Sequence, residues 1–200
     1  LCPSPFFELQ PVSELYRAAG LYQWRSVGDD PSFRVKPLGG FRAGWFMFSV
    51  QLSSTVTRME AKLYVDYGNG FVEQEAIVLP LQLGKLSKRV VYFASKPLRM
   101  RFDPLEQACF LTVNQVSLSR LTAGYARKLM VKKLSGRGMT DCKQQSDTEL
   151  FALYGKCFES AQRGMPYSQW LALYEPPPLQ PKQVTTALAS LTVKPLISLV

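Results

Sequence analysis

The stretch Leu98–Asp103, LRMRFD, decides the fold class of this chain. Apolar and charged side chains alternate strictly along it, with Leu98, Met100 and Phe102 on one face and only charged residues on the other. A period of two is typical of a β-strand with one buried and one solvated face. The stretch therefore predicts a half-buried strand in an antiparallel sheet.

The same period extends outward through the first 121 residues. Aromatic and β-branched runs of strand length occupy 45–52 and 88–94, and residues 109–121 form a longer alternating run. Residues 60–81 contain two such runs around Gly68-Asn69-Gly70, a sequence that favours the positive φ angles of a tight hairpin. Seven or eight strands in about 120 residues predict an antiparallel β-sandwich, jelly-roll-like, over residues 1–121.

The pattern becomes helical after Arg120. Residues 121–134 have apolar side chains near helical spacing, and Ser146 stands three residues before Glu149, as in a capping box. We expect a small helical segment at 122–175, which includes a short helix at 166–175. Three prolines at 176–178 then predict an extended, Pro-rich linker and a C-terminal tail over 176–200.

Composition excludes several classes of enzyme. The chain has 200 residues, 46% of them hydrophobic, and it has no histidine. Ser-His-Asp and Cys-His catalysis and zinc sites built on imidazole are therefore excluded. Glu73 and Glu75 would share one face of a strand, which favours a solvated edge over a pair of catalytic carboxylates. We expect no catalytic residue and no metal site in these 200 residues, so the sequence leaves open whether the protein is an enzyme.

Two segments near the C-terminus carry motifs. The expected helix MPYSQWLALYE contains Tyr167, Trp170, Leu171, Tyr174 and Glu175, and residues 194–200 read KPLISLV. In this order the two segments resemble bacterial family 2 glycosyltransferases, in which such a helix precedes the first strand of the GT-A catalytic domain. The β-rich part resembles the N-terminal region of larger members that build lipopolysaccharide or other surface glycans, at 44–46, 61–66 and 98–104.

The resemblance implies a role for the chain and its surroundings. It implies a non-catalytic accessory or docking module of a glycosyltransferase in bacterial surface glycan synthesis, with the natural protein continuing past Val200 into the catalytic domain. That missing domain would use a nucleotide-sugar donor and a divalent metal, whereas this chain would hold no cofactor. The expected partners are a glycan or lipid-linked acceptor and the neighbouring catalytic domain. The expected location is the cytoplasm, where the protein could also contact the inner membrane peripherally. The alternative is a free-standing carbohydrate-binding β-sandwich module.

Two groups of residues are candidate binding sites. Exposed rings and polar groups at the predicted hairpin could bind a sugar, and they are Tyr64, Asp66, Tyr67 and Asn69. A basic helix could contact a membrane or another anion, through Arg127, Lys128, Lys132, Lys133 and Arg137. The net charge of +9 is compatible with a nucleic-acid partner, but no nucleic-acid-reading motif is present, so we expect none.

Overall fold

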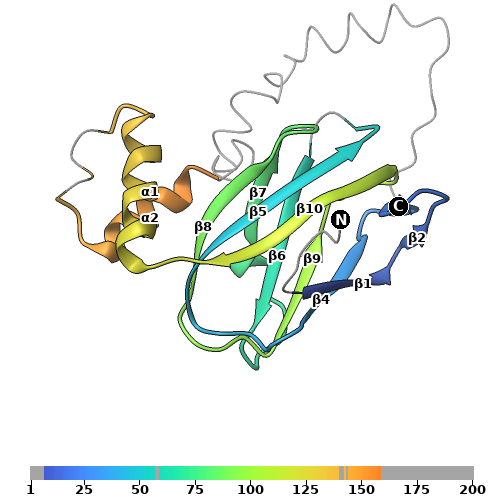
Figure 1. The fold of residues 1–200 in the computed structure, drawn as a ribbon, viewed down its shortest axis with the longest axis horizontal. Helices are drawn as coiled ribbons and strands as arrows, with labels where there is room; N and C mark the ends of the chain where they lie inside the picture. Colours follow the sequence, from blue (N-terminus) through green and yellow to red (C-terminus); the bar gives the residue numbers. More distant parts are fainter. Residues whose placement is uncertain (1–6, 57–58, 140–141, 143, 159–200) are drawn as a thin grey trace, which may run out of the picture. The chain divides into compact units, whose positions relative to one another are not determined.

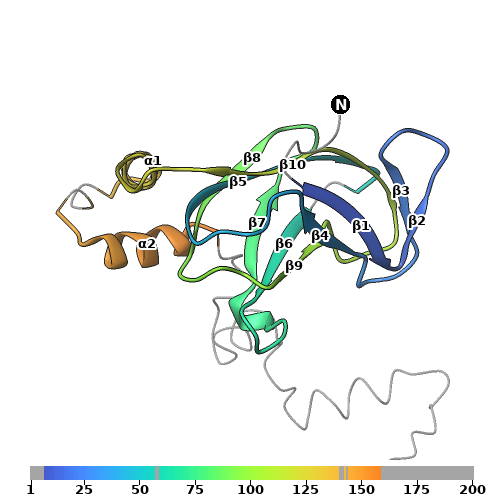
Figure 2. The same ribbon diagram turned by 60° about the horizontal axis from the view of Figure 1, so that its bottom comes forward.

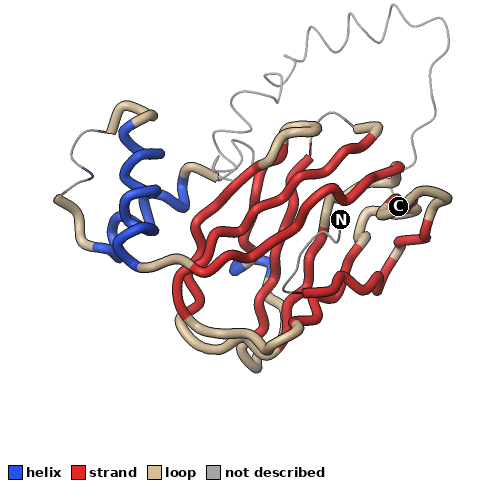
Figure 3. Tube along the Cα trace, in the orientation of Figure 1, coloured by secondary structure: helices blue, strands red, loops and turns tan. Residues whose placement is uncertain are grey.

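The computed structural model describes residues 7–56, 59–139, 142 and 144–158. Within them, strands dominate and two helices follow the last strand (Figure 1, Figure 3). The strands are β1 Phe7–Ser13, β2 Leu15–Arg17, β3 Gln23–Ser26, β4 Ser32–Pro37, β5 Gly44–Ser54, β6 Met59–Asp66, β7 Ile77–Leu81, β8 Ser87–Phe93, β9 Arg99–Asp103 and β10 Phe110–Arg120. The helices are η1 Glu73–Glu75, a single 3₁₀ turn, α1 Ala123–Ser135 and α2 Asp147–Lys156.

The ten strands form two antiparallel five-stranded sheets. The first sheet has the order β1-β4-β9-β6-β7 and the second sheet the order β2-β3-β10-β5-β8. From β3 to β10 the chain changes sheet at every connection except the β6–β7 hairpin, and this order is that of a jelly roll. Strand β1 extends the first sheet and β2 extends the second. The prediction of a jelly-roll-like β-sandwich is thereby confirmed.

The core lies between the two sheets, which form separate layers in Figure 2. Phe102 from β9 contacts Phe33 within the first sheet and Phe48 from the second, with ring centroids 6.3 and 6.2 Å apart. Met100 and Phe102 are buried as predicted. Leu98 is 62% exposed, contrary to the prediction, because it precedes the first residue of β9 and lies outside the alternation.

The two helices pack on the second sheet and share its core. Both lie beside β8 at the same end of the sandwich (Figure 1, Figure 2). Trp45 of β5 meets Phe151 of α2 edge to face, with ring centroids 5.3 Å apart, and the Tyr154 hydroxyl accepts a hydrogen bond from the Val90 amide at 2.9 Å. Strand β8 is the edge of its sheet, so α2 covers one of the unpaired donors that an edge strand exposes.

Local sequence signals explain where these helices begin. The Thr122 hydroxyl accepts the Tyr125 amide at the start of α1. The predicted capping box is present at α2, where Ser146 and Glu149 each accept the other's backbone amide. Among the described helices, none is long and apolar enough to cross a membrane. The predicted helix at 166–175, the linker and the final strand lie outside the described residues, so the proposed domain boundaries stay predictions.

Candidate functional site

Asp66, one of the predicted sugar-binding residues, stabilises the turn at Gly68–Gly70. The prediction of a tight hairpin there is wrong, because the connection between β6 and β7 runs over residues 67–76 and includes the 3₁₀ turn η1. Its buried carboxylate accepts the amides of Gly68 at 2.7 Å and Gly70 at 2.9 Å, and it also pairs with Arg99. These amides, first that of Gly68, and the guanidinium hold the pKa of Asp66 below its ordinary value. Gly68 and Gly70 have φ angles of 128° and 85°, which residues with a Cβ rarely adopt.

The hydroxyl of Tyr64 is also hydrogen-bonded within the protein. The side chain is buried, its hydroxyl donates to the Glu73 carboxylate, and the Arg101 guanidinium carbon lies 5.3 Å from the ring centroid. Burial, and next the hydrogen bond to Glu73, raise the pKa of Tyr64. Tyr67 is 40% exposed and Asn69 is exposed. The structure therefore divides the four predicted residues into two buried and two accessible ones, and their assignment to a sugar site stays a prediction.

The outer face of the first sheet is a network of paired charges around Tyr64. Lys62 of β6, 5% exposed in its side chain, forms ion pairs with Glu73 at 2.8 Å and with Glu106. Glu73 and Glu75 lie in the 3₁₀ turn η1, so the prediction that they share a strand face is wrong. The tight turn replaces the extended backbone there.

Arg101 continues this network along β9. Its guanidinium pairs with Asp103 at 2.8 Å and with Asp30 from the β3–β4 loop. Burial raises the pKa of Asp103 to about 6, although Arg101 opposes the shift. Within the described residues, no group of three His, Cys, Asp or Glu side chains could hold a metal ion. Five carboxylates of this network are each paired with a cation of the protein itself, and they are Asp30, Asp66, Glu73, Asp103 and Glu106.

The predicted basic helix is α1 with the turn that follows it, and three of its five cations contact the α2 segment. Arg127 pairs with Asp147 and donates to the Gln145 carbonyl, and Arg137 donates to the Cys157 carbonyl at 3.0 Å. Lys133 lies 4.9 Å from the Phe158 ring centroid. Lys128 and Lys132 are exposed. Lys133 and Arg137 are exposed as well, so the contacts with the α2 segment leave four of the five cations accessible, and the membrane or anion contact stays a prediction.

The outer face of the second sheet carries a feature that the sequence did not reveal. The strand register places Tyr16 of β2 opposite Arg25 of β3, and Arg25 opposite Phe110 of β10. These three residues, the aromatic row, therefore lie side by side across three adjacent strands. Tyr16 is 62% and Phe110 is 55% exposed, and the Arg25 guanidinium carbon lies 5.9 Å from the Phe110 ring centroid.

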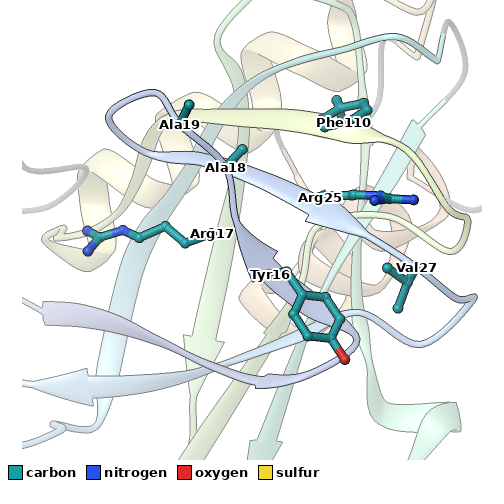
Figure 4. A pocket seen from close by; sticks show the side chains of 7 residues that line it. All are labelled: Tyr16, Arg17, Ala18, Ala19, Arg25, Val27 and Phe110. Carbon is teal, nitrogen blue, oxygen red and sulfur yellow. The ribbon is translucent and has the colours of Figure 1, made fainter.

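A shallow depression of about 640 Å³ lies at this row. Figure 4 shows the seven residues that line it, with Arg17 extending in the opposite direction from Arg25. The lining includes two arginines and no acidic side chain. Two large exposed rings, with Arg25 on the strand between them, offer apolar surface next to strong hydrogen-bond donors.

Neutral polar side chains continue the face beside the aromatic row. The next register row joins Gln23 of β3, Thr112 of β10 and Ser53 of β5, and the Ser53 hydroxyl donates to the Asn114 side-chain oxygen at 2.9 Å. These four residues form the amide–hydroxyl group. Gln23 and Asn114 are exposed, while Thr112 and Ser53 are half-buried. Amides and hydroxyls both donate and accept hydrogen bonds, as a ligand rich in hydroxyl groups requires.

Two features of the chain made the residues of this face hard to predict from the sequence. Strand β2 has only three residues, too few for a visible alternation. In the run 109–121, alternation predicts that Phe110, Thr112 and Val116 share one face, but a bulge between Val113 and Gln115 reverses the register. Phe110 and Thr112 consequently lie on the outer face, whereas Val116 is 1% exposed in the core.

Comparison with known proteins gives little further information. No protein-family model matches the chain, and no curated protein matches it. Among solved structures, a chain described as "CBM4 structure and function" superposes with a TM-score of 0.39 and 11% sequence identity. The superposition covers 58% of this chain and 81% of that chain. A likeness at this level does not bear on function, which has to be argued from the residues of the site.

Proposed function

We propose that this β-sandwich is a glycan-binding module that holds a sugar chain on the outer face of its second sheet. The observation that carries the proposal is the aromatic row, Tyr16, Arg25 and Phe110, lying directly beside the amide–hydroxyl group. Both sets of side chains come from neighbouring strands, so the sheet fixes their spacing before a ligand arrives. A rigid, preformed site loses little conformational entropy on binding.

The chemistry of a sugar ring fits this arrangement. A pyranose has an apolar face of C–H groups and a rim of hydroxyls, so it needs a flat apolar partner next to donors and acceptors. Tyr16 and Phe110 supply exposed rings, and Gln23 and Asn114 supply amides beside them. Packing against a sugar face removes apolar surface of both partners from water, which favours association.

Arg25 adds a preference among glycans. Its guanidinium lies near the Phe110 ring and can donate to a carboxylate in a bidentate manner. Because Arg25 lies between the two rings and the depression has no acidic residue, we expect a chain of uronic acids to bind more tightly than a neutral chain of the same length. That preference should weaken at high salt, since Arg25 is exposed to solvent.

Affinity electrophoresis tests the proposal directly. Wild-type protein is run through native gels containing alginate, pectate, dextran or a mixed-linkage glucan, and titration calorimetry follows for any polymer that retards it. Tyr16→Ala and Phe110→Ala should each weaken binding about tenfold, which corresponds to about 1.4 kcal/mol. Tyr125→Ala, which removes a ring that is 53% exposed on α1, is the matched control and should bind like wild type.

Two results would count against the proposal. Failure of every polymer to retard the wild-type protein removes the glycan-binding function. Normal binding by the Tyr16 and Phe110 variants, combined with loss of binding in Tyr67→Ala, keeps the function but moves the site to the hairpin turn predicted from the sequence.

The glycosyltransferase connection stays a prediction. Its more specific motifs lie at 165–175 and 194–200, outside the described residues, and so do the expected linker and final strand. An accessory role in surface glycan synthesis would be compatible with a sugar-binding sandwich, because an acceptor glycan needs a place to bind near the catalytic domain. The nucleotide-sugar donor, the metal and the cytoplasmic or membrane-peripheral location belong to that prediction.

A further inference from the structure

A pocket with different chemistry lies at one end of the sandwich, between the two sheets. It has a volume of about 570 Å³, within the range typical of small-molecule sites. Apolar side chains from both sheets line it. From the first sheet come Phe7 of β1 and Met100 of β9, and from the second come Phe46, Phe93 and Leu118 of β5, β8 and β10.

Glycines in the β4–β5 loop leave this end of the core open. Gly39 and Gly40 line the pocket, and a Cβ built on either would meet no atom within 4 Å. Gly40 has a φ angle of 79°, which directs the loop in a way that other residues rarely can. Phe41, Phe46 and Leu118 are half-buried and form the accessible part of the lining, whereas Phe7, Phe93 and Met100 are each at most 5% exposed.

The mouth of the pocket is cationic. Arg42, from the β4–β5 loop, and Arg120, the last residue of β10, are both exposed and line it, and none of its twelve lining residues is acidic. In the part of the chain that the structure describes, neither arginine forms an ion pair. Two guanidinium groups beside an apolar interior match a ligand with one anionic head and one apolar tail.

We infer that this pocket binds a single-chain anionic amphiphile, with its alkyl chain between the sheets and its carboxylate or phosphate monoester head on Arg42 and Arg120. The ligand would enter the end of the sandwich, so the site is separate from the glycan-binding face. The aliphatic part would replace water against Phe46, Phe93 and Leu118, and the arginines would fix the direction of insertion.

Titration calorimetry with monomeric dodecanoate and dodecyl phosphate, below their micelle concentrations, tests this inference. Affinity should rise about fourfold per methylene from octanoate through decanoate to dodecanoate, since each added group leaves water for the pocket. Dodecanol has the same chain without the charge and should bind at least tenfold more weakly. The two head groups distinguish the sources, because dodecanoate represents a free fatty acid and dodecyl phosphate a phospholipid-like head.

Variants separate the pocket from the rest of the surface. The double substitution Arg42→Gln and Arg120→Gln should weaken dodecanoate binding at least tenfold while leaving dodecanol nearly unchanged. Leu118→Phe should shorten the longest chain that still gains affinity, and circular dichroism confirms that it folds. Arg25→Gln, which removes a cation from the glycan-binding face, is the matched control and should bind dodecanoate like wild type.

Three outcomes would overturn the inference. They are a wild-type protein that takes up neither amphiphile, an affinity that does not change with chain length, and equal binding by the wild type and the double arginine variant. None of them bears on glycan binding. Conversely, a protein that binds dodecanoate but no polysaccharide would keep this pocket and remove the proposed function.

Discussion

The hydrogen bond between Tyr154 and Val90 should make a measurable contribution to stability. Tyr154→Phe removes only the hydroxyl, and the ring keeps its place 5.0 Å from the Phe158 ring. The Val90 amide, in a residue that is 0% exposed, then loses the acceptor at 2.9 Å. Because β8 is the edge of the second sheet, the next strand cannot supply a replacement.

The size of the effect follows from leaving a buried donor unpaired. Such a group costs about 1–3 kcal/mol, more than the net value of an ordinary hydrogen bond. Phenylalanine introduces no cavity beyond one oxygen atom, so packing terms should be small. We therefore expect the free energy of unfolding to fall by about 1–3 kcal/mol and the melting temperature to fall by roughly 2–12 °C.

Urea denaturation followed by circular dichroism measures this change, with the m-value checking that both proteins unfold in the same way. Tyr125→Phe, on the exposed side of α1, is the matched control and should stay within about 0.5 kcal/mol of wild type. If Tyr154→Phe is also within that margin, α2 does not protect the β8 edge at Val90, and the reasoning fails.

Three further predictions concern charges and a helix cap. Burial raises the pKa of Asp103 to about 6, so the folded state binds this proton more tightly than the unfolded chain does. The free energy of unfolding should therefore fall by up to about 3 kcal/mol as the pH rises from 4 to 6.5. In urea denaturation at a series of pH values, Asp103→Asn should reduce this dependence on pH. The pKa of Asp66 is lowered instead, so the contribution of this carboxylate to stability is present at neutral pH and lost in acid. Asp66→Asn should speed amide hydrogen exchange at Gly68 and Gly70, and unchanged exchange rates would contradict this prediction. Ser146→Ala should cost about 1 kcal/mol by removing the α2 capping box, with Ser135→Ala near the end of α1 as a control that should change little.

The fold was largely predictable because alternation survives in most of the strands. The run at 98–103 and the hairpin at 60–81 each show which face is buried, and Met100 and Phe102 are in the core as expected. Strand β1 was not predicted, because Pro11 interrupts the run of residues that favour a strand. It lies at the edge of the first sheet, with a register shift after Pro11, where a residue without an amide donor is tolerated.

The candidate site was much less predictable, because it depends on which strands are neighbours. Tyr16, Arg25 and Phe110 come from three separate segments, and only the pairing of β2, β3 and β10 brings them into one row. A single sequence does not determine that pairing. The bulge after Val113 adds a second obstacle, because one extra residue moves every later side chain of β10 to the other face.

The electrostatics of the two outer faces explain why a ligand should prefer the second sheet. On the first, Lys62, Arg101 and Asp103 already have charged partners, and several of these groups are buried. A ligand there would have to replace existing ion pairs, and separating a buried pair costs several kcal/mol because one charge stays without compensation. On the second, exposed rings and neutral amides are solvated mainly by water, which a sugar can displace by offering equivalent hydrogen bonds. The turn residues around Asp66 thus stabilise the scaffold, while the aromatic row remains free to bind.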